Sequence, residues 1–341
     1  MPIEYTGVVA EHTAVRTAVG IFDVSHMGKV RIHGDGAAAF LNTLLANDLD
    51  RVSDGQAQYS MLCNERGGVV DDLIVYRWAD DEIFMIPNAS NAATVVAALL
   101  AAAPTSVTIE DHHETLGIIA VQGPNSEALI ASMGMPADHD YMAMARTEFR
   151  GEPVIVCRTG YTGEHGYELV APLGVLVDLW DALLARRDEF GVVRAGLGAR
   201  DTLRTEMGYP LHGQDISADI TPVEAGLGWA IGWDKPEFAG RGALTKQRAE
   251  GPTRRLRGLL SSDRGIPRPH MQVRASAAEP LAGAVIGEVT SGTFSPTLKQ
   301  GVALALLDSS IAIGDEVVVD VRGRESTFTV VKPPFVAAST R

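Results

Sequence analysis

The chain has 341 residues, of which 46% are hydrophobic and 21% are charged, and it carries a formal net charge of −14. This length predicts two or three domains, and the acidic balance argues against nucleic acid as a partner, because phosphate binding needs a basic face. No apolar stretch is long enough to span a membrane and no basic-then-apolar signal segment opens the chain, so we expect no membrane partner and a cytoplasmic protein.

Helical and strand patterns alternate through the first three quarters of the chain. Six segments have the periodicity of helices, namely residues 36–45, 91–103, 125–133, 175–187, 198–207 and 242–249. Strand-like runs lie between them, and those at 154–158 and 167–170 are joined by a loop too short for a parallel crossover. The pattern therefore predicts an α+β fold rather than a strict βαβ series.

Several short motifs in this region favour structural roles. The HGDGAAA segment (33–39) matches a dinucleotide fingerprint but lacks the βαβ unit around it, so we interpret it as a glycine turn that starts a helix. The DHHE segment (111–114) predicts a surface turn rather than a metal site, because adjacent side chains point in different directions. His26 is typical of a hydrogen-bonded core histidine, and Cys63 and Cys157 of buried, reduced thiols.

The stretch NERGGVVDDLIVY (64–76) places two adjacent carboxylates in a run that otherwise reads as a buried strand. Gly67 and Gly68 mark the turn before it. Side chains alternate along a strand, so Asp71 and Asp72 are expected on opposite faces. That arrangement argues against a glycosidase or an aspartic protease, which needs two converging carboxyls. The segment alone leaves open whether one aspartate is a working carboxylate or both simply cap the strand entrance or pair there with a nearby arginine.

The block RTGYTGEHGYELV (158–170) carries three glycines spaced three apart, and such a loop can bring its backbone close to a flat ligand. Tyr161 supplies a ring and a hydroxyl. Glu168 supplies a carboxylate that can accept two hydrogen bonds from an amidine-like edge. A wide hairpin turn with an ordinary charged tip is the alternative for these residues alone.

The block GLGARDTLRTEMGYPLHGQDI (196–216) places Arg200 and Arg204 four residues apart, hence on one face of the predicted helix. The two arginines could serve an anionic ligand or orient Asp72. The alternative is a solvated face on which Asp201 and Glu206 are the surface partners.

From residue 254 onward the pattern changes to short strands between Gly, Pro and Asp turns. The strand-like runs are 256–260, 284–289, 302–307, 317–321 and 326–331. They predict a small C-terminal barrel, and residues 250–253 are the expected linker into it.

Taken together, these blocks resemble the glycine-cleavage T-protein family, the tetrahydrofolate-dependent aminomethyltransferases. The motifs that carry the resemblance cover nearly the whole chain: FDVSHMG (22–28), NERGGVVDDLIVY (64–76), IPNASN (86–91), AVQGP (120–124), RTGYTGEHGYEL (158–169), GLGARDTLRTE (196–206), SPTL (295–298) and VKPPFV (331–336). The resemblance implies an α+β, three-domain cloverleaf around a central opening that holds the folate, with a C-terminal β-barrel. The implied domains are 1–29 with 113–216, 30–112 with 217–254, and 255–341.

The resemblance also implies an activity and a site. The methylene carbon of an aminomethyl group on the dihydrolipoyl arm of the carrier protein (H-protein) would pass to tetrahydrofolate, the cosubstrate, with release of ammonia and without a metal. Asp72 is implied as the acid/base or electrostatic residue beside the folate. The implied folate-binding residues are Met27, Tyr59, Asn88, Tyr141, Tyr161, Glu168, Arg200 and Tyr209, with Glu168 at the pterin edge and Arg200 near the catalytic carboxylate.

Proteins of the same fold offer two alternative functions for this chain. A folate-dependent demethylase acting on a small O-, S- or N-methyl donor is the main alternative. A non-catalytic folate-binding protein is disfavoured, because RTGYTGEHG stands where its KGCYxGQ signature would be. Members of the family usually carry a further segment before the MPxxY motif, here residues 1–5, so we expect a shortened first domain or a misassigned start, with folate binding retained and a lower melting temperature than an extended version.

Overall fold

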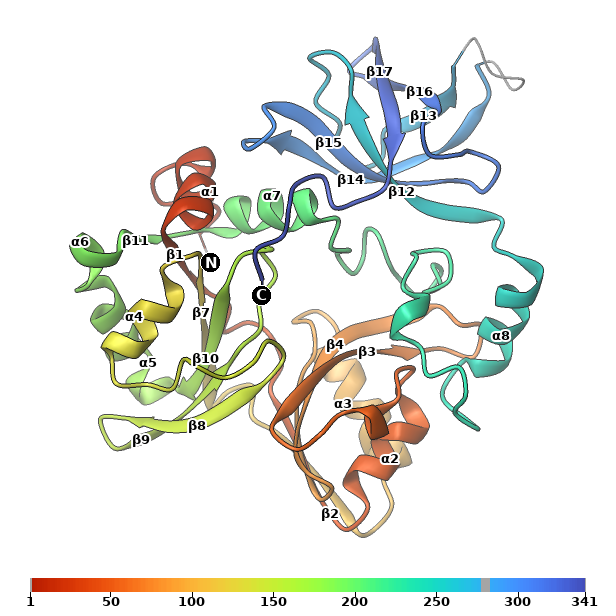
Figure 1. The fold of residues 1–341 in the computed structure, drawn as a ribbon. Helices are drawn as coiled ribbons and strands as arrows, with labels where there is room; N and C mark the ends of the chain where they lie inside the picture. Colours follow the sequence, from red (N-terminus) through yellow and green to blue (C-terminus); the bar gives the residue numbers. More distant parts are fainter. Residues whose placement is uncertain (1, 277–282, 341) are drawn as a thin grey trace.

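The computed structural model describes residues 2–276 and 283–340, which form three sheets with flanking helices (Figure 1). The first sheet has the order β11 (Val192–Arg194), β1 (Val19–Asp23), β7 (Leu116–Gln122), β10 (Gly166–Pro172), β9 (Glu152–Cys157), β8 (Met144–Phe149). The second has the order β3 (Gln56–Cys63), β4 (Val69–Ala79), β5 (Glu82–Ile86), β2 (Val30–Gly34), β6 (Val107–Asp111). The third closes into a barrel in the order β12 (Arg254–Ser261), β15 (Gln300–Asp308), β14 (Val285–Ser295), β13 (Gln272–Ala275), β16 (Glu316–Val321), β17 (Arg324–Val331).

The chain leaves the first sheet after β1, builds the second sheet with β2 to β6, and returns to the first with β7. The predicted α+β class and the C-terminal barrel are confirmed. The exact domain boundaries given above stay a prediction.

Helices cover the outer faces of the first two sheets (Figure 1). The helices are α1 (Val8–Thr17), α2 (Ala37–Leu44), α3 (Ala92–Ala102), α4 (Ser126–Ser132), α5 (Leu173–Leu184), α6 (Arg187–Phe190), α7 (Leu197–Met207) and α8 (Arg241–Glu250), with 3-10 turns η1 (Leu49–Arg51) and η2 (Gly228–Ala230). Leu129 of α4 and Leu183 of α5 are buried in the core of the first sheet, and Leu41 of α2 and Val95 of α3 in that of the second. Among the described residues, no helix combines the length and the apolar composition needed to cross a membrane.

A third cluster of buried residues joins the first two sheets, with Phe22 from the first and Tyr76 from the second. Burial of this kind contributes roughly 25 cal/mol per Å² of apolar surface, which makes the junction a rigid base for side chains at its rim. The residues of the candidate functional site lie at or next to this junction.

The sequence patterns did not predict helix α1 or strand β13, for identifiable reasons. The buried face of α1 carries Glu11 and His12, so its hydrophobic periodicity is hidden. Strand β13 has only four residues, and polar residues alternate with its buried Val273 and Ala275. The glycine turn at 33–39 and the turn at 111–114 are confirmed, since Gly36 adopts a left-handed conformation (φ 81°) directly before α2 and residues 113–115 form a turn.

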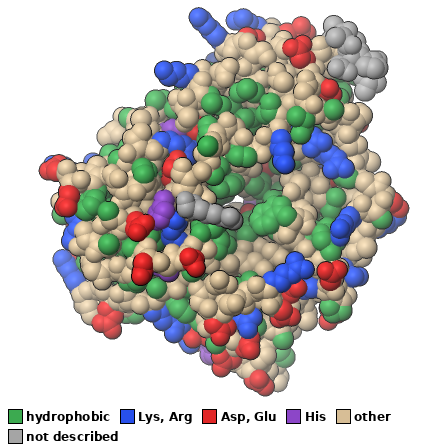
Figure 2. Space-filling view, viewed as in Figure 1, with side chains coloured by type: hydrophobic (Ala, Val, Ile, Leu, Met, Phe, Trp, Pro, Cys, Tyr) green, Lys and Arg blue, Asp and Glu red, His purple; other side chains and the backbone are tan. Residues whose placement is uncertain are grey.

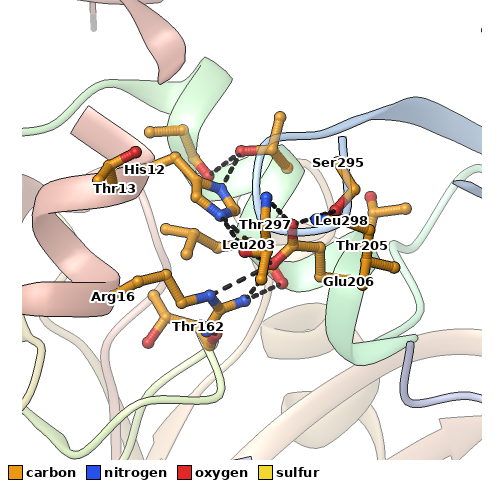
Figure 3. A network of polar contacts seen from close by, with 12 residues as sticks. His12, Thr13, Arg16, Thr162, Leu203, Thr205, Glu206, Ser295, Thr297 and Leu298 are labelled. Atoms are coloured by element: carbon orange, nitrogen blue, oxygen red, sulfur yellow. Dashed lines mark hydrogen bonds and ion pairs between the residues drawn. The ribbon is translucent and has the colours of Figure 1, made fainter. Parts of the chain in front are cut away.

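Helix α7 is joined to α1 and to the barrel by a buried polar network around Glu206 (Figure 3). The Glu206 carboxylate accepts hydrogen bonds from Arg16 Nη2 at 2.8 Å, Ser295 Oγ at 2.5 Å and Thr297 Oγ1 at 3.0 Å. Glu206 is fully buried, so the alternative that placed it on a solvated helix face is wrong. Asp201 does lie at the surface, where it pairs with Arg204.

The C-terminal tail, residues 332–340, runs from the barrel back to the first sheet (dark blue in Figure 1). The backbone N–H of Ser339 donates to the carbonyl of Gly163 at 2.7 Å, and Arg158 Nη2 donates to the carbonyl of Thr340 at 2.9 Å. The tail therefore ends beside the glycine loop of the first sheet.

Both cysteines are buried and free, as predicted. Burial raises the pKa of the Cys63 thiol to about 12, and it raises the pKa of Cys157 as well. Because the thiolate is the reactive form, we expect neither thiol of the native protein to react with a disulfide reagent such as DTNB at pH 8, and both to react after unfolding in guanidinium. A prompt reaction of the native protein would contradict this burial.

Candidate functional site

The surface is hollowed at the centre of the view in Figure 2, between the three lobes and next to the C-terminal end of the chain. The candidate residues come from three segments with distinctive sequence motifs. These segments are strand β4, the glycine loop before β10, and helix α7.

The turn before β4 is built by Gly67 and Gly68, as predicted. Gly67 has a φ of 83°, and a Cβ on Gly68 would lie 1.9 Å from the carbonyl oxygen of Ala218. Val69 N–H then donates to the carbonyl of Ser217 at 2.8 Å. The segment after α7 therefore fixes the start of β4, and with it the two aspartates that follow.

Asp71 and Asp72 follow the predicted alternation, with Asp71 completely buried and Asp72 half-buried. The inference that alternation separates them needs a correction. One amide group joins them, because Asn88 Nδ2 lies 2.9 Å from Asp71 Oδ1 and 2.8 Å from Asp72 Oδ1. Within the described part of the chain, no arginine or lysine forms an ion pair with either carboxylate, so the alternative of an arginine partner is wrong.

The two carboxylates differ in how well they are hydrogen-bonded. Asp71 accepts from the Asn88 backbone N–H at 3.0 Å, from Asn88 Nδ2, and from Asn91 Nδ2 at 2.7 Å. Asp72 accepts from Tyr59 Oη at 3.0 Å and shares the Asn88 amide, whose two hydrogens face three oxygens. Asp72 is therefore the carboxylate with unused hydrogen-bonding capacity.

Burial raises the pKa of Asp72 to about 6, and the neighbouring charge of Asp71 adds to the increase. Hydrogen bonds from Tyr59 and Asn88 act in the opposite direction. A carboxyl with such a pKa can exchange a proton near neutral pH, which is the property that acid/base catalysis requires. This combination of burial, partners and pKa makes Asp72 the strongest candidate for a catalytic residue.

Sequence reasoning missed the support behind Asp71. Asn91 Nδ2 also lies 2.9 Å from His212 Nδ1, and His212 Nε2 lies 2.9 Å from the carbonyl oxygen of Val69. A carbonyl only accepts, so Nε2 carries the proton and Nδ1 accepts from the amide. His212 stands 143 residues from Val69, so no local pattern signals this contact.

Tyr59 connects Asp72 to an exposed aromatic side chain. Its ring stacks on Trp229 with centroids 5.7 Å apart and an interplanar angle of 25°. Burial raises the pKa of the Tyr59 hydroxyl far above its usual value, and the charge of Asp72 raises it further, so Tyr59 is a hydrogen-bond donor. Trp229 is 68% exposed and was not among the predicted residues.

Glu168 is held by its neighbour in the glycine loop. Thr159 Oγ1 donates to Glu168 Oε2 at 2.6 Å, and the Thr159 hydroxyl lies 2.9 Å from Tyr76 Oη. The loop glycines need a correction, because they approach protein side chains rather than a ligand. A Cβ on Gly160 or Gly166 would collide with Gln122 at 2.1 and 2.4 Å, and one on Gly163 would lie 2.3 Å from Met207 Sδ.

Arg200, Tyr161 and Tyr209 form a second aromatic group. The Arg200 guanidinium lies 4.8 Å above the ring of Tyr161, which stacks on Tyr209 with centroids 5.8 Å apart. Arg200 forms no ion pair with Asp72. Burial lowers the pKa of its guanidinium, and the nearby charge of Glu168 acts in the opposite direction. Its Nη1 is buried without a hydrogen-bond partner among the described residues. A buried guanidinium nitrogen without a partner is costly, so this atom is a candidate contact for a ligand, and the role of Arg200 stays a prediction.

Three further residues lie around this group. Met27 packs at the edge of the cluster that joins the two sheets. Tyr141 has Arg158 5.9 Å from its ring centroid. His26 has a buried Nδ1 without a partner among the described residues, so the expectation of a hydrogen-bonded core histidine is wrong for this atom. Across the same residues no group of three or more metal-ligating side chains is found.

Comparisons with known proteins identify the family. Residues 1–235 match the GCVT N-terminal domain, and residues 254–337 match the glycine cleavage T-protein C-terminal barrel domain. The chain is 60% identical to an aminomethyltransferase of Parafrankia sp. (strain EAN1pec) over 100% of this chain and 93% of the relative. It is 53% identical to an aminomethyltransferase of Mycobacterium tuberculosis (strain H37Rv), over 100% of this chain and 92% of that one.

A solved structure shows the same fold. The glycine cleavage system aminomethyltransferase T from Bartonella henselae superposes with a TM-score of 0.92 at 34% identity, covering 99% of this chain and 92% of the other. Both family models, the full-length identities and this superposition lead to one conclusion. The chain belongs to the glycine cleavage T-protein family of aminomethyltransferases.

Proposed function

We propose that this protein transfers the methylene carbon of an aminomethyl group, carried on the lipoyl arm of the H-protein, to tetrahydrofolate with release of ammonia in the cytoplasm. The observation that supports the proposal most strongly is Asp72, a half-buried carboxyl with a raised pKa that is held between Tyr59 and Asn88. The demethylase alternative is not favoured, because relatives that match the full chain carry the name aminomethyltransferase.

The residues around Asp72 fit tetrahydrofolate, which supplies the nitrogen nucleophile. Glu168 Oε2 accepts from Thr159, and we expect the free Oε1 together with the second lone pair of Oε2 to accept from the two donors of a pterin edge. The unpartnered Arg200 Nη1 suits a carbonyl or carboxylate oxygen of the same ligand. The stacked pairs Tyr59–Trp229 and Tyr161–Tyr209 offer flat walls for its rings.

Asp72 has two tasks in this proposal. As a carboxylate in a desolvated site it stabilises the positive charge that develops on the reacting nitrogen. As a group that titrates near neutral pH it takes up a proton during the transfer. Tyr59 and Asn88 keep its oxygens in place for both tasks.

The direct test mixes the protein with tetrahydrofolate and a carrier protein that bears the aminomethyl-lipoyl group. Ammonia should appear only when all three are present. An absence of ammonia together with demethylation of another donor would overturn the assignment in favour of the demethylase. A carrier protein without its lipoyl group is the matched control.

The pH profile gives a second test. Since the pKa of Asp72 is raised to about 6 and the ionised form is the working one, we expect kcat/KM to fall as the pH drops through about 6 and to level off above it. Tyr59→Phe removes a hydrogen bond that lowers the pKa of Asp72, so its acid limb should move to higher pH. An unchanged limb in this variant would contradict the assignment of the limb to Asp72.

A further inference from the structure

We propose that the hydroxyl groups of Tyr76 and Thr159 are a positioning relay for the Glu168 carboxylate, so that strand β4 aligns both carboxylates of the site. The inference rests on the proposed function, because it assumes that Glu168 receives the pterin edge. It assigns a role to two buried hydroxyls that the family motifs alone do not explain.

The direction of the relay follows from hydrogen counting. An ionised carboxylate only accepts, so Thr159 donates its single hydroxyl hydrogen to Glu168 Oε2 at 2.6 Å. Thr159 Oγ1 must then accept from Tyr76 Oη, which lies 2.9 Å away. The chain of donors runs from Tyr76 to Thr159 to Glu168. The Cys157 thiol also interacts with the Tyr76 hydroxyl, and as a weak donor it can donate to Tyr76 Oη while the Tyr76 hydrogen goes to Thr159.

The surroundings make this relay rigid. Tyr76 is completely buried and Thr159 nearly so, and the Tyr76 ring packs against Phe84 at a centroid distance of 6.2 Å. Hydrogen bonds in such an environment are stronger than at the surface, and losing one leaves a buried group unpaired. Holding Oε2 in this way leaves the other oxygen of Glu168 with one defined direction toward a ligand.

The relay also crosses between two sheets. Tyr76 lies on β4 of the second sheet. Thr159 lies in the loop that follows β9 of the first sheet, and Glu168 lies on β10 of the same sheet. Asp72 lies on β4 four residues before Tyr76, a spacing of roughly 13 Å along a strand. The same strand therefore sets the position of Asp72 and, through Tyr76, the orientation of Glu168. A ligand that reaches both carboxylates would be held in register with β4.

The test compares Tyr76→Phe, Thr159→Val and Thr159→Ser with the wild type. The dissociation constant of tetrahydrofolate and the kcat and KM of ammonia release are measured for each. We expect Thr159→Val to weaken tetrahydrofolate binding and raise KM by about 10-fold with a smaller change in kcat, because one charge-assisted hydrogen bond is lost. Thr159→Ser keeps the hydroxyl and should bind as the wild type does. Tyr76→Phe acts through Thr159, and adding it to Thr159→Val should have little further effect.

Tyr167→Phe is the matched control, since Tyr167 is also completely buried and donates its hydroxyl to the carbonyl of Ala137, outside the relay. If Thr159→Val does not fold, Tyr76→Phe against Tyr167→Phe decides, and weaker binding in the first alone supports the relay. Binding unchanged in folded Tyr76→Phe and Thr159→Val, with an active wild type, overturns the relay but leaves the proposed function standing. A wild type that does not bind tetrahydrofolate overturns both.

Discussion

Replacing Asp72 by Asn is expected to reduce turnover by about 10²-fold or more while tetrahydrofolate binding stays nearly unchanged. The substitution keeps the shape of the side chain and an oxygen for the Tyr59 hydroxyl at 3.0 Å. It removes the negative charge and the group that takes up a proton. Steady-state ammonia release gives the turnover, and titration with tetrahydrofolate gives the dissociation constant. Unchanged turnover would remove Asp72 from the chemistry.

The stability of this variant distinguishes a catalytic role from a structural one. The folded-state pKa of Asp72 is raised from 3.8 to about 6, so ionising it costs folding free energy, and this cost grows as the pH rises from about 4 to about 6. Asp72→Asn removes this cost, and the Asn88 amide, which loses Asp72 Oδ1, keeps Asp71 Oδ1 and the Asp72 carbonyl as acceptors for its two hydrogens, so the melting temperature at pH 7 should not fall. Asp71→Asn is the contrasting control. Burial raises the pKa of Asp71 as well, so the contrast rests on hydrogen bonds. Asp71 accepts from three N–H groups, and the amide of an asparagine there would place its own N–H donors against them and lower the melting temperature.

The sequence predicted strand β4 and its two faces well, because alternation is a local property. It did not predict that Asn88 would join Asp71 and Asp72, or that His212 would support Asn91. These contacts bring together segments far apart in the chain, and their residue types are common in loops. Alternation along a strand predicts the face of the sheet to which a side chain points. It does not predict which residue from a distant part of the chain contacts that side chain.

In the glycine loop, by contrast, the sequence predicted a contact that the structure does not have. Its regular spacing suggested a backbone that approaches a ligand, yet the space beside Gly160 and Gly166 is filled by the side chain of Gln122. A glycine indicates that another group lies close to the backbone, but it does not show whether that group belongs to a ligand or to the protein. Helix α1 escaped prediction for a related reason, because Glu11 and His12 on its buried face are satisfied by partners that the sequence does not reveal.

The second large effect is expected at Glu206, where Glu206→Gln should destabilise the protein by about 3–5 kcal/mol. The carboxylate is fully buried and accepts from Arg16, Ser295 and Thr297, so an amide would place its own N–H groups against these donors and leave the Arg16 charge undercompensated. Thermal and urea unfolding of the full chain measure the loss. Glu110→Gln is the control, since Glu110 is 39% exposed in its pair with Arg31 and should cost less than about 1 kcal/mol.

The pH dependence of the stability lost in Glu206→Gln identifies the cause of that loss. Burial alone would raise the pKa of Glu206, but the hydrogen bond and charge of His12, with the bonds from Ser295 and Arg16, lower it from 4.5 to about 2. A depressed carboxyl contributes stability that is complete above about 4.5 and is lost as the pH falls toward 2, on the order of 3 kcal/mol here. The gap between wild type and Glu206→Gln should therefore shrink below pH 4.5. A gap that stays constant down to pH 3 would mean that packing, not charge, joins α7 to the barrel.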